Sequence, residues 1–127
     1  GGAAMIYQKD WLLRQIEMFV QFIARLIFHK DTVNYEIPDE TNLRQTDLLY
    51  NEIRQLVASG KICEAEDLLY ARMDTGDLTY LELAADFYQA LNGLEDAELE
   101  RCNFPRVEIH DGLKTLLALY GFQNFIE

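Results

Sequence analysis

The first long segment of the chain combines a narrow polar stripe with a wide apolar surface. Between Tyr7 and Phe28, five of the polar side chains recur at helical spacing and fall within an arc of roughly 80° on a helical wheel. A surface helix needs an apolar stripe only a little wider than ~100°, whereas this segment is apolar over most of the remaining circumference. A helix over residues 7–29 is therefore expected to bury two faces. The five polar positions are Asp10, Arg14, Glu17, Gln21 and Arg25.

The apolar surface of this predicted helix divides into two neighbouring stripes. Trp11, Met18 and Phe22 follow each other at spacings of seven and four, and Leu12, Ile16, Phe19 and Ile23 form the second stripe. We expect one stripe to pack inside the domain and the other to pack against a partner; burial of both within one chain is the alternative. The candidate interface residues are Trp11, Ile16, Met18, Phe19, Phe22 and Ile23.

Helical periodicity returns at residue 47 and continues almost to the end of the chain. Residues 47–59 and 61–73 each present one apolar side, and Gly60 between them suits a left-handed helix cap. Such a short connection predicts an antiparallel hairpin. Further helices are predicted at residues 78–91, 95–101 and 104–120.

Together these patterns predict an all-α protein, a compact bundle of five to six helices. Residues 31–46 form an irregular connection that is longer than usual, which predicts either a lid or an arm laid along the first helix. Residues 1–4 (Gly-Gly-Ala-Ala) are interpreted as a cloning remnant, and residues 5–127 as one helical domain.

Charge and cysteine content narrow the range of functions. The 127 residues carry 22 acidic and 11 basic side chains, a net charge of −11 that argues against a nucleic-acid partner. The charge is uneven, because residues 1–30 hold four basic and two acidic groups, whereas residues 31–127 hold seven and twenty. Two cysteines are too few for a secreted disulfide scaffold, and no signal peptide is recognisable, so a cytoplasmic protein is expected.

The residues that usually carry catalysis are sparse. Ser59 is the only serine and lacks a nucleophile-elbow context, and no glycine cluster could cradle a phosphate. Acidic neighbours should raise the pKa of Cys63, which argues against a reactive thiolate. The set Cys63, Cys102, His29 and His110 lacks the paired spacing of a zinc site, and His110 is expected at the surface or edge of its helix. We therefore expect no enzyme, no bound metal and no cofactor.

Gly112 is unusual because it lies inside a predicted helix and not in a turn or at a helix end. It lies inside the last predicted helix, where glycine costs about 1 kcal/mol relative to alanine. This cost predicts a close helix–helix contact at that position.

Several stretches of the chain resemble a known family. Residues 5–12 (Met-Ile-Tyr-Gln-Lys-Asp-Trp-Leu) through Phe28-His29-Lys30-Asp31, together with residues 63–69 and 83–88, are similar to a family of small bacterial proteins of unassigned function. That family is found chiefly in Gram-positive gut anaerobes. The resemblance spans nearly the whole chain, and it implies a compact helical protein without assigned catalytic residues.

Residues 47–73 also resemble a tetratricopeptide hairpin. Ala65 and Leu69 match the small and bulky positions of that repeat's second helix, although Asp77 stands where the closing proline belongs. The resemblance implies a peptide-binding groove. Its candidate residues are Leu49, Tyr50, Ile53, Leu69 and Tyr70.

The expected function is therefore non-enzymatic: a helical interaction or scaffold protein that forms a homodimer through its first helix. A peptide-binding module using the hairpin is one alternative. A membrane-surface adaptor is another, because the apolar first helix carries net positive charge.

Overall fold

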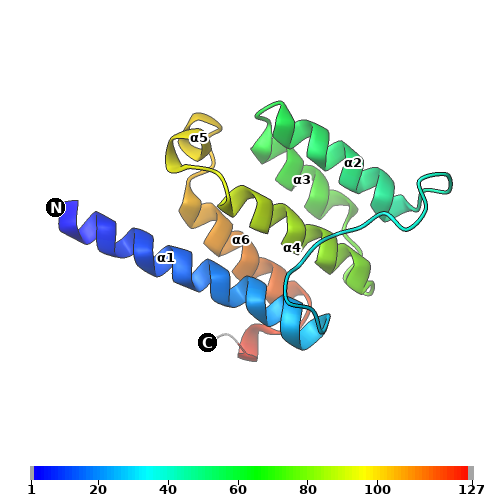
Figure 1. The fold of residues 1–127 in the computed structure, drawn as a ribbon, viewed down its shortest axis with the longest axis horizontal. Coiled ribbons are helices and arrows are strands. Elements are labelled where there is room, and N and C mark those ends of the chain that lie inside the picture. The colour runs from blue at the N-terminus through cyan, green and yellow to red at the C-terminus, as the bar shows by residue number, and fades with distance from the viewer. Residues whose placement is uncertain (1, 126–127) are drawn as a thin grey trace.

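The chain forms helices connected by short turns and one long irregular segment. The computed structural model describes the backbone of residues 2–125 and the side chains of residues 9–124. Within this part the chain is all-helical, as the sequence predicts, and contains no strand (Figure 1). The α-helices are α1 (Gly2–Phe22), α2 (Gln45–Ala58), α3 (Ile62–Arg72), α4 (Leu78–Asn92), α5 (Asp96–Arg101) and α6 (Arg106–Leu119), and the shorter turns are a π-helical turn, η1 (Ile23–Ile27), and a 3-10 turn, η2 (Gln123–Phe125).

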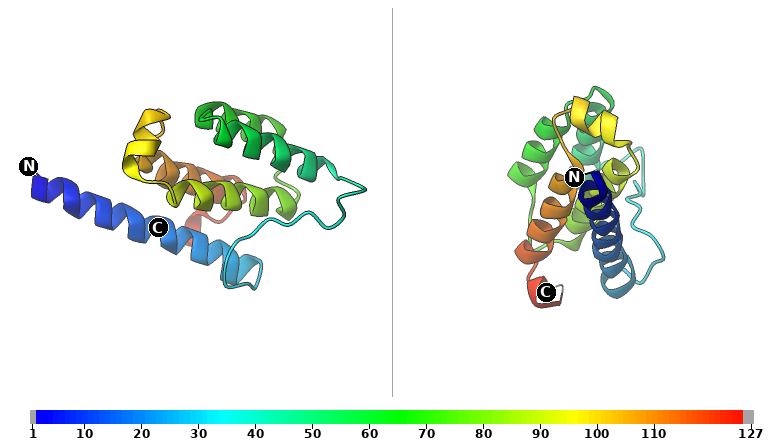
Figure 2. Two further views of the ribbon diagram at one scale, coloured as in Figure 1. Left: turned by 45° about the horizontal axis from the view of Figure 1, so that its top comes forward. Right: turned by 90° about the vertical axis from the view of Figure 1, so that its left-hand side faces the viewer.

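Helix α4 occupies the centre of the bundle and contacts α1, α2 and α6 (Figures 1 and 2). The α2–α3 hairpin lies on one side of it, and α1 and α6 lie on the other and run in the same direction. The sequence predicts a central α4 because only three polar residues interrupt its apolar surface. This prediction is confirmed, because the structure buries Leu81, Ala84, Ala85, Phe87, Tyr88 and Leu91.

Cap residues define the ends of three helices, and the left-handed cap predicted at Gly60 is confirmed. Gly60 and Gly121 adopt the left-handed conformation, with φ of 78° and 83°, after α2 and α6. Asp77 caps α4, because its Oδ1 accepts a hydrogen bond of 2.9 Å from the backbone nitrogen of Thr79.

Two helices begin earlier than predicted. The helical backbone of α1 includes residues from Gly2 onward, five positions before Tyr7. Helix α2 starts at Gln45 because the carboxylate of Asp47 turns back to the residue before the helix, and its Oδ2 accepts a hydrogen bond of 2.8 Å from the Arg44 nitrogen.

The long connection, here called the strap (residues 28–44), crosses α4 on its way to α2 (Figure 1). Glu82 of α4 pairs with Lys30 at 2.9 Å, and Gln89 Nε2 donates to the Val33 carbonyl at 3.2 Å. The strap therefore packs across α4 and is bonded to it. Its length predicted either a lid or an arm along α1, and the structure shows neither arrangement.

The close contact predicted at Gly112 is confirmed. A Cβ atom placed on Gly112 would overlap the phenol ring of Tyr88, which is fully buried on α4. Glycine is therefore needed in α6 so that α4 can approach it at this level.

Candidate functional site

The outer side of α1 carries a line of exposed apolar side chains. Trp11, Met18 and Leu26 are 45%, 59% and 67% exposed. Trp11 and Met18 are seven residues apart, which places them on the same side of an α-helix. We call Trp11, Met18 and Leu26 the α1 stripe.

The π-helical turn η1 brings Leu26 onto this line. The backbone nitrogen of Phe28 bonds to the carbonyl of Ile23, five residues earlier, at 3.2 Å. Such a turn contains one more residue than an α-helical turn. The side of the helix on which each later residue lies is therefore displaced by one position relative to a regular α-helix. In a regular α-helix Arg25, seven residues after Met18, would lie on the same side as Met18, whereas the wider turn brings Leu26, eight residues after Met18, toward that side. The sequence pattern gives no sign of this turn.

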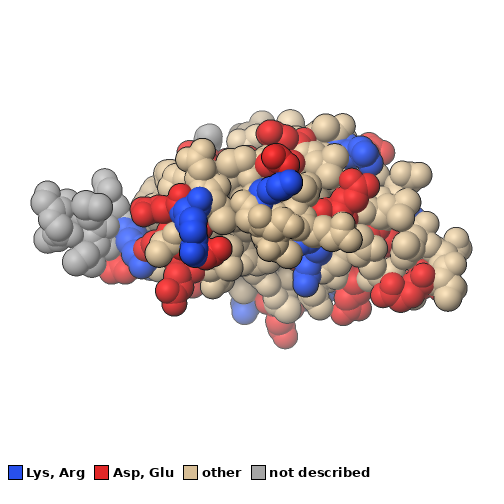
Figure 3. Space-filling model, turned by 90° about the horizontal axis from the view of Figure 1, so that it is seen from above, with Lys and Arg blue, Asp and Glu red and all other residues tan. Residues whose placement is uncertain are grey.

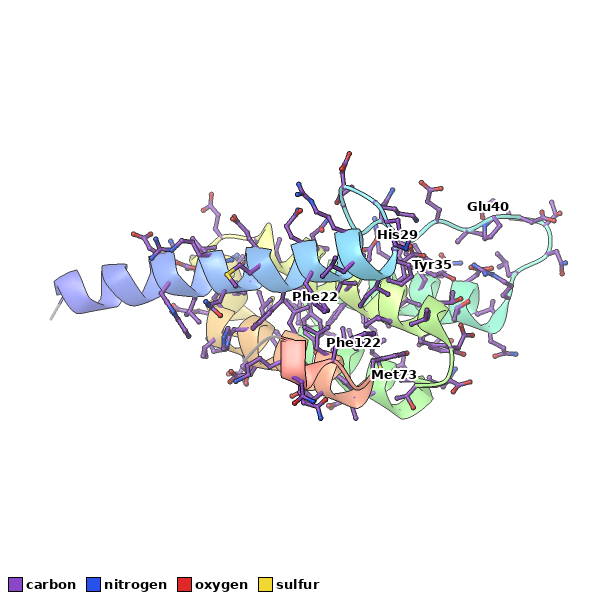
Figure 4. The ribbon with its side chains drawn as sticks, turned by 90° about the horizontal axis from the view of Figure 1, so that it is seen from below. Phe22, His29, Tyr35, Glu40, Met73 and Phe122 are labelled. Carbon is purple, nitrogen blue, oxygen red and sulfur yellow. The ribbon has the colours of Figure 1, made fainter. Side chains whose placement is uncertain are left out.

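The inner side of α1 packs into the core of its own chain. Ile16, Phe19 and Ile23, three of the six candidate interface residues, are 0%, 3% and 0% exposed. Phe22 is half-buried, and its ring lies 5.9 Å from that of Phe122, just beyond α6 (Figure 4). Trp11 and Met18 are therefore the candidates whose side chains remain accessible to a partner.

Trp11 is held in place on the edge that faces α6. Its ring centroid lies 5.3 Å from that of His110, which also stacks against Phe19 at 5.4 Å. The prediction that His110 lies at the surface is wrong, since only 8% of the residue is exposed. The aromatic neighbours from α1 cover the imidazole, a long-range packing effect that the local sequence around His110 does not reveal.

Charge around α1 is partly neutralised by the rest of the chain. Lys9 pairs with Asp96 at 2.6 Å, and Lys30 pairs with Glu82. Within the described side chains, Arg14 and Arg25 form no ion pair, so they supply the free positive charge of this helix. Figure 3 looks onto the side of the molecule that carries α2, α3 and α5, where acidic and basic side chains are interspersed without a continuous basic patch.

The five residues predicted to form a peptide groove do not all line one open surface, although Tyr50 and Ile53 line the same hollow between α2 and α4. Leu49, Ile53 and Leu69 are at most 2% exposed, because the inner side of the hairpin faces the core. Tyr70 Oη lies 2.8 Å from Tyr88 Oη and donates to the Gly112 carbonyl at 3.2 Å. Tyr50 is the partly exposed member on α2.

A buried polar cluster joins the strap to α2. The carboxylate of Asp47, fully buried, accepts hydrogen bonds from Tyr35 Oη at 2.5 Å and from Arg44 Nε and Nη2, both at 3.1 Å. The Arg44 guanidinium and the Tyr35 hydroxyl hold the pKa of Asp47 down at about 2. Burial and the neighbouring carboxylate raise the pKa of Tyr35 to about 12. Both oxygens of the Asp47 carboxylate and the Tyr35 hydroxyl are hydrogen-bonded within the chain, so the cluster anchors the strap to α2.

The depressed pKa of Asp47 predicts a specific acid sensitivity. The ionised carboxylate stabilises the fold above the unfolded pKa of about 4, and this contribution is lost as the pH falls toward the folded value. We expect Asp47→Asn to lower the free energy of unfolding by about 2 kcal/mol at pH 6, with the difference from wild type shrinking between pH 4 and pH 2. Urea unfolding of both proteins at pH 6 and pH 3 measures this difference in the free energy of unfolding. A difference independent of pH would contradict the assignment, and Glu52→Gln, on the exposed side of α2, is the control.

Cys63 and the possible metal ligands are the chemical groups that the sequence singled out besides α1 and the hairpin. The predicted rise in the pKa of Cys63 is confirmed, although burial is the main cause and the nearby acidic groups, Glu108 first, add to it. Among the described residues, no three acidic, histidine or cysteine side chains come together as a metal site. None of the helices in the searched part of the chain has the length and apolarity needed to cross a membrane.

Comparison with known proteins places this helical domain in a family. The model of DUF6483, a family of unknown function, matches residues 6–121. No curated protein and no solved structure matches. Because the match spans most of its length, the chain belongs to DUF6483, a family of unknown function.

Proposed function

We propose that this chain is a helical protein–protein interaction domain that forms a homodimer through the α1 stripe. The observation that carries the proposal is the exposure of three large apolar side chains, Trp11 and Met18 of α1 and Leu26 of the π-turn that continues it. Single exposed apolar residues are common on protein surfaces, whereas contiguous ones mark interaction sites. Aromatic and methionine side chains are also enriched in such interfaces.

The spacing of the stripe suits pairing with a second copy. Met18 lies seven residues after Trp11 and eight before Leu26, and the π-turn compensates for the extra residue. If two α1 helices cross antiparallel with Met18 at the two-fold axis, Trp11 of each copy meets Leu26 of the other. A symmetric dimer requires this self-complementarity, because both copies contribute the same surface.

Charge favours α1 over the rest of the surface for this contact. Two identical chains, each with a net charge of −11, repel one another over most approaches. Residues 1–30 hold four basic and two acidic groups, and the pairing of Lys9 with Asp96 and of Lys30 with Glu82 leaves this region close to neutral, whereas the acidic excess lies in residues 31–127. Approach through α1 therefore brings together the surfaces that repel least.

Replacing Met18 by glutamate tests the proposal. With Met18 at the two-fold axis, the two introduced carboxylates would face each other in the contact and repel, so we expect the dimer dissociation constant to rise at least tenfold, measured by sedimentation velocity. The melting temperature of the monomer should change little, because Met18 is 59% exposed.

The matched control is Gln21→Glu, which adds the same charge at an exposed position of α1 in the polar arc. It should leave the dissociation constant within about twofold, since exposed charges interact weakly. Equal weakening by both variants would refute a contact through the stripe. Flotation of the chain with anionic vesicles, lost in Met18→Glu, would instead favour the membrane-surface alternative.

A further inference from the structure

A hollow between α2 and α4 has the properties of a small-molecule site. It has a volume of about 290 Å³, and no residue of α1 lines it, so it is independent of the proposed dimer contact. For comparison, a dry cavity of about 150 Å³ accommodates benzene. The apolar lining includes Ile53, Val57, Leu83 and Phe87.

Three polar side chains complete the lining: Tyr50, Arg54 and Asp86. Asp86 Oδ2 accepts a hydrogen bond of 2.7 Å from the Tyr35 backbone nitrogen, whereas Oδ1 accepts none from the described residues. Arg54 Nη1 donates to Tyr50 Oη at 2.9 Å. One carboxylate oxygen is thus the free acceptor of a largely apolar site.

The walls of the hollow are held in place by the strap. The ring of Tyr50 packs against that of Tyr35 at a centroid distance of 4.7 Å, and Tyr35 is fixed in turn by Asp47. The same residue, Tyr35, holds Asp86 through its backbone nitrogen. Side chains positioned before binding lose little conformational entropy when a ligand arrives.

The balance of charge decides the class of ligand. Arg54 and Asp86 have opposite charges, so a charged ligand is attracted by one and repelled by the other. Burying an ionised group in an apolar site without full compensation is also costly. A neutral ligand avoids both penalties.

We infer that the hollow binds a neutral, flat aromatic molecule of one or two rings that donates one N–H or O–H hydrogen bond to Asp86. The rings fill the volume beside the more accessible apolar lining residues, Val57, Ala90 and Leu94, and the donor satisfies the free carboxylate oxygen.

Indole is the probe that tests this inference, added to the full-length ¹⁵N-labelled chain and followed by amide chemical shifts. We expect saturable shifts confined to α2 and α4. Filling the hollow with Ala90→Phe should weaken binding at least tenfold, since Ala90 lines the site and is exposed enough to accept a larger side chain. The same substitution at Ala71, exposed on α3 and outside the hollow, should leave binding unchanged.

Two isomers of methylindole isolate the hydrogen bond. 3-Methylindole keeps the N–H donor and 1-methylindole lacks it, so the wild type should bind the former about tenfold more tightly. In Asp86→Asn this preference should fall at least fivefold, while the substituted side chain can still accept from Tyr35. A preference that persists in Asp86→Asn would overturn the role of Asp86. Absence of saturable shifts at α2 and α4 would overturn the site.

Discussion

Replacing Arg106 by alanine is expected to lower the free energy of unfolding by about 3 kcal/mol. The side chain is 9% exposed, and its guanidinium joins the start of α6 to the end of α4. It donates to Asp96 Oδ1 at 2.9 Å, to both the carbonyl and Oδ1 of Asn92, and to the Leu94 carbonyl at 2.7 Å. Alanine would remove the donors to the Asn92 and Leu94 carbonyl groups, and it would leave the Asp96 carboxylate with Lys9 as its remaining ion-pair partner.

The control for this prediction is Arg106→Lys. Lysine keeps the positive charge but cannot reproduce the planar fork that reaches several acceptors at once. We expect it to recover less than half of the lost stability in urea unfolding. Full recovery would mean that charge alone matters at this position, contrary to the hydrogen-bond pattern.

Gly112→Ala is expected to destabilise the fold by about 2 kcal/mol, even though alanine is the better helix former. The added methyl group would overlap the ring of Tyr88. That ring cannot move freely, because its hydroxyl donates to Glu66 at 2.7 Å and lies 2.8 Å from the Tyr70 hydroxyl. Thermal and urea unfolding measure the loss.

Two further variants separate this overlap from a general effect of glycine replacement. Gly93→Ala, where φ is −77° and the nearest atom to a Cβ is 3.4 Å away, should be neutral or slightly stabilising. Combining Gly112→Ala with Tyr88→Leu should cost less than the sum of the two single variants, because leucine removes the overlapping ring atoms. Strict additivity would show that the two residues do not clash.

The helices and their caps could be predicted because they depend on local spacing. The apolar periodicity of α4, the cap residue Gly60, and the unusual cost of Gly112 inside a helix are all properties of short stretches of sequence. Each was confirmed.

The polar clusters could not be predicted because their partners are distant in sequence. Tyr35 and Asp86 are 51 residues apart, and Arg106 and Asn92 are 14 apart. His110 is similarly buried by rings from α1. The π-turn that aligns Leu26 with Met18 leaves no periodic signal, since its five residues are apolar or basic like those before them. Which of the candidate interface residues are accessible could therefore be learned only from the structure.

Light scattering on the wild-type chain during size-exclusion chromatography tests the proposed dimer most directly. With concentrations from 1 to 100 µM loaded at neutral pH and moderate salt, the proposal predicts a species of twice 14.8 kDa at the upper end, dissociating on dilution. A mass of 14.8 kDa throughout this range would contradict self-association through the α1 stripe.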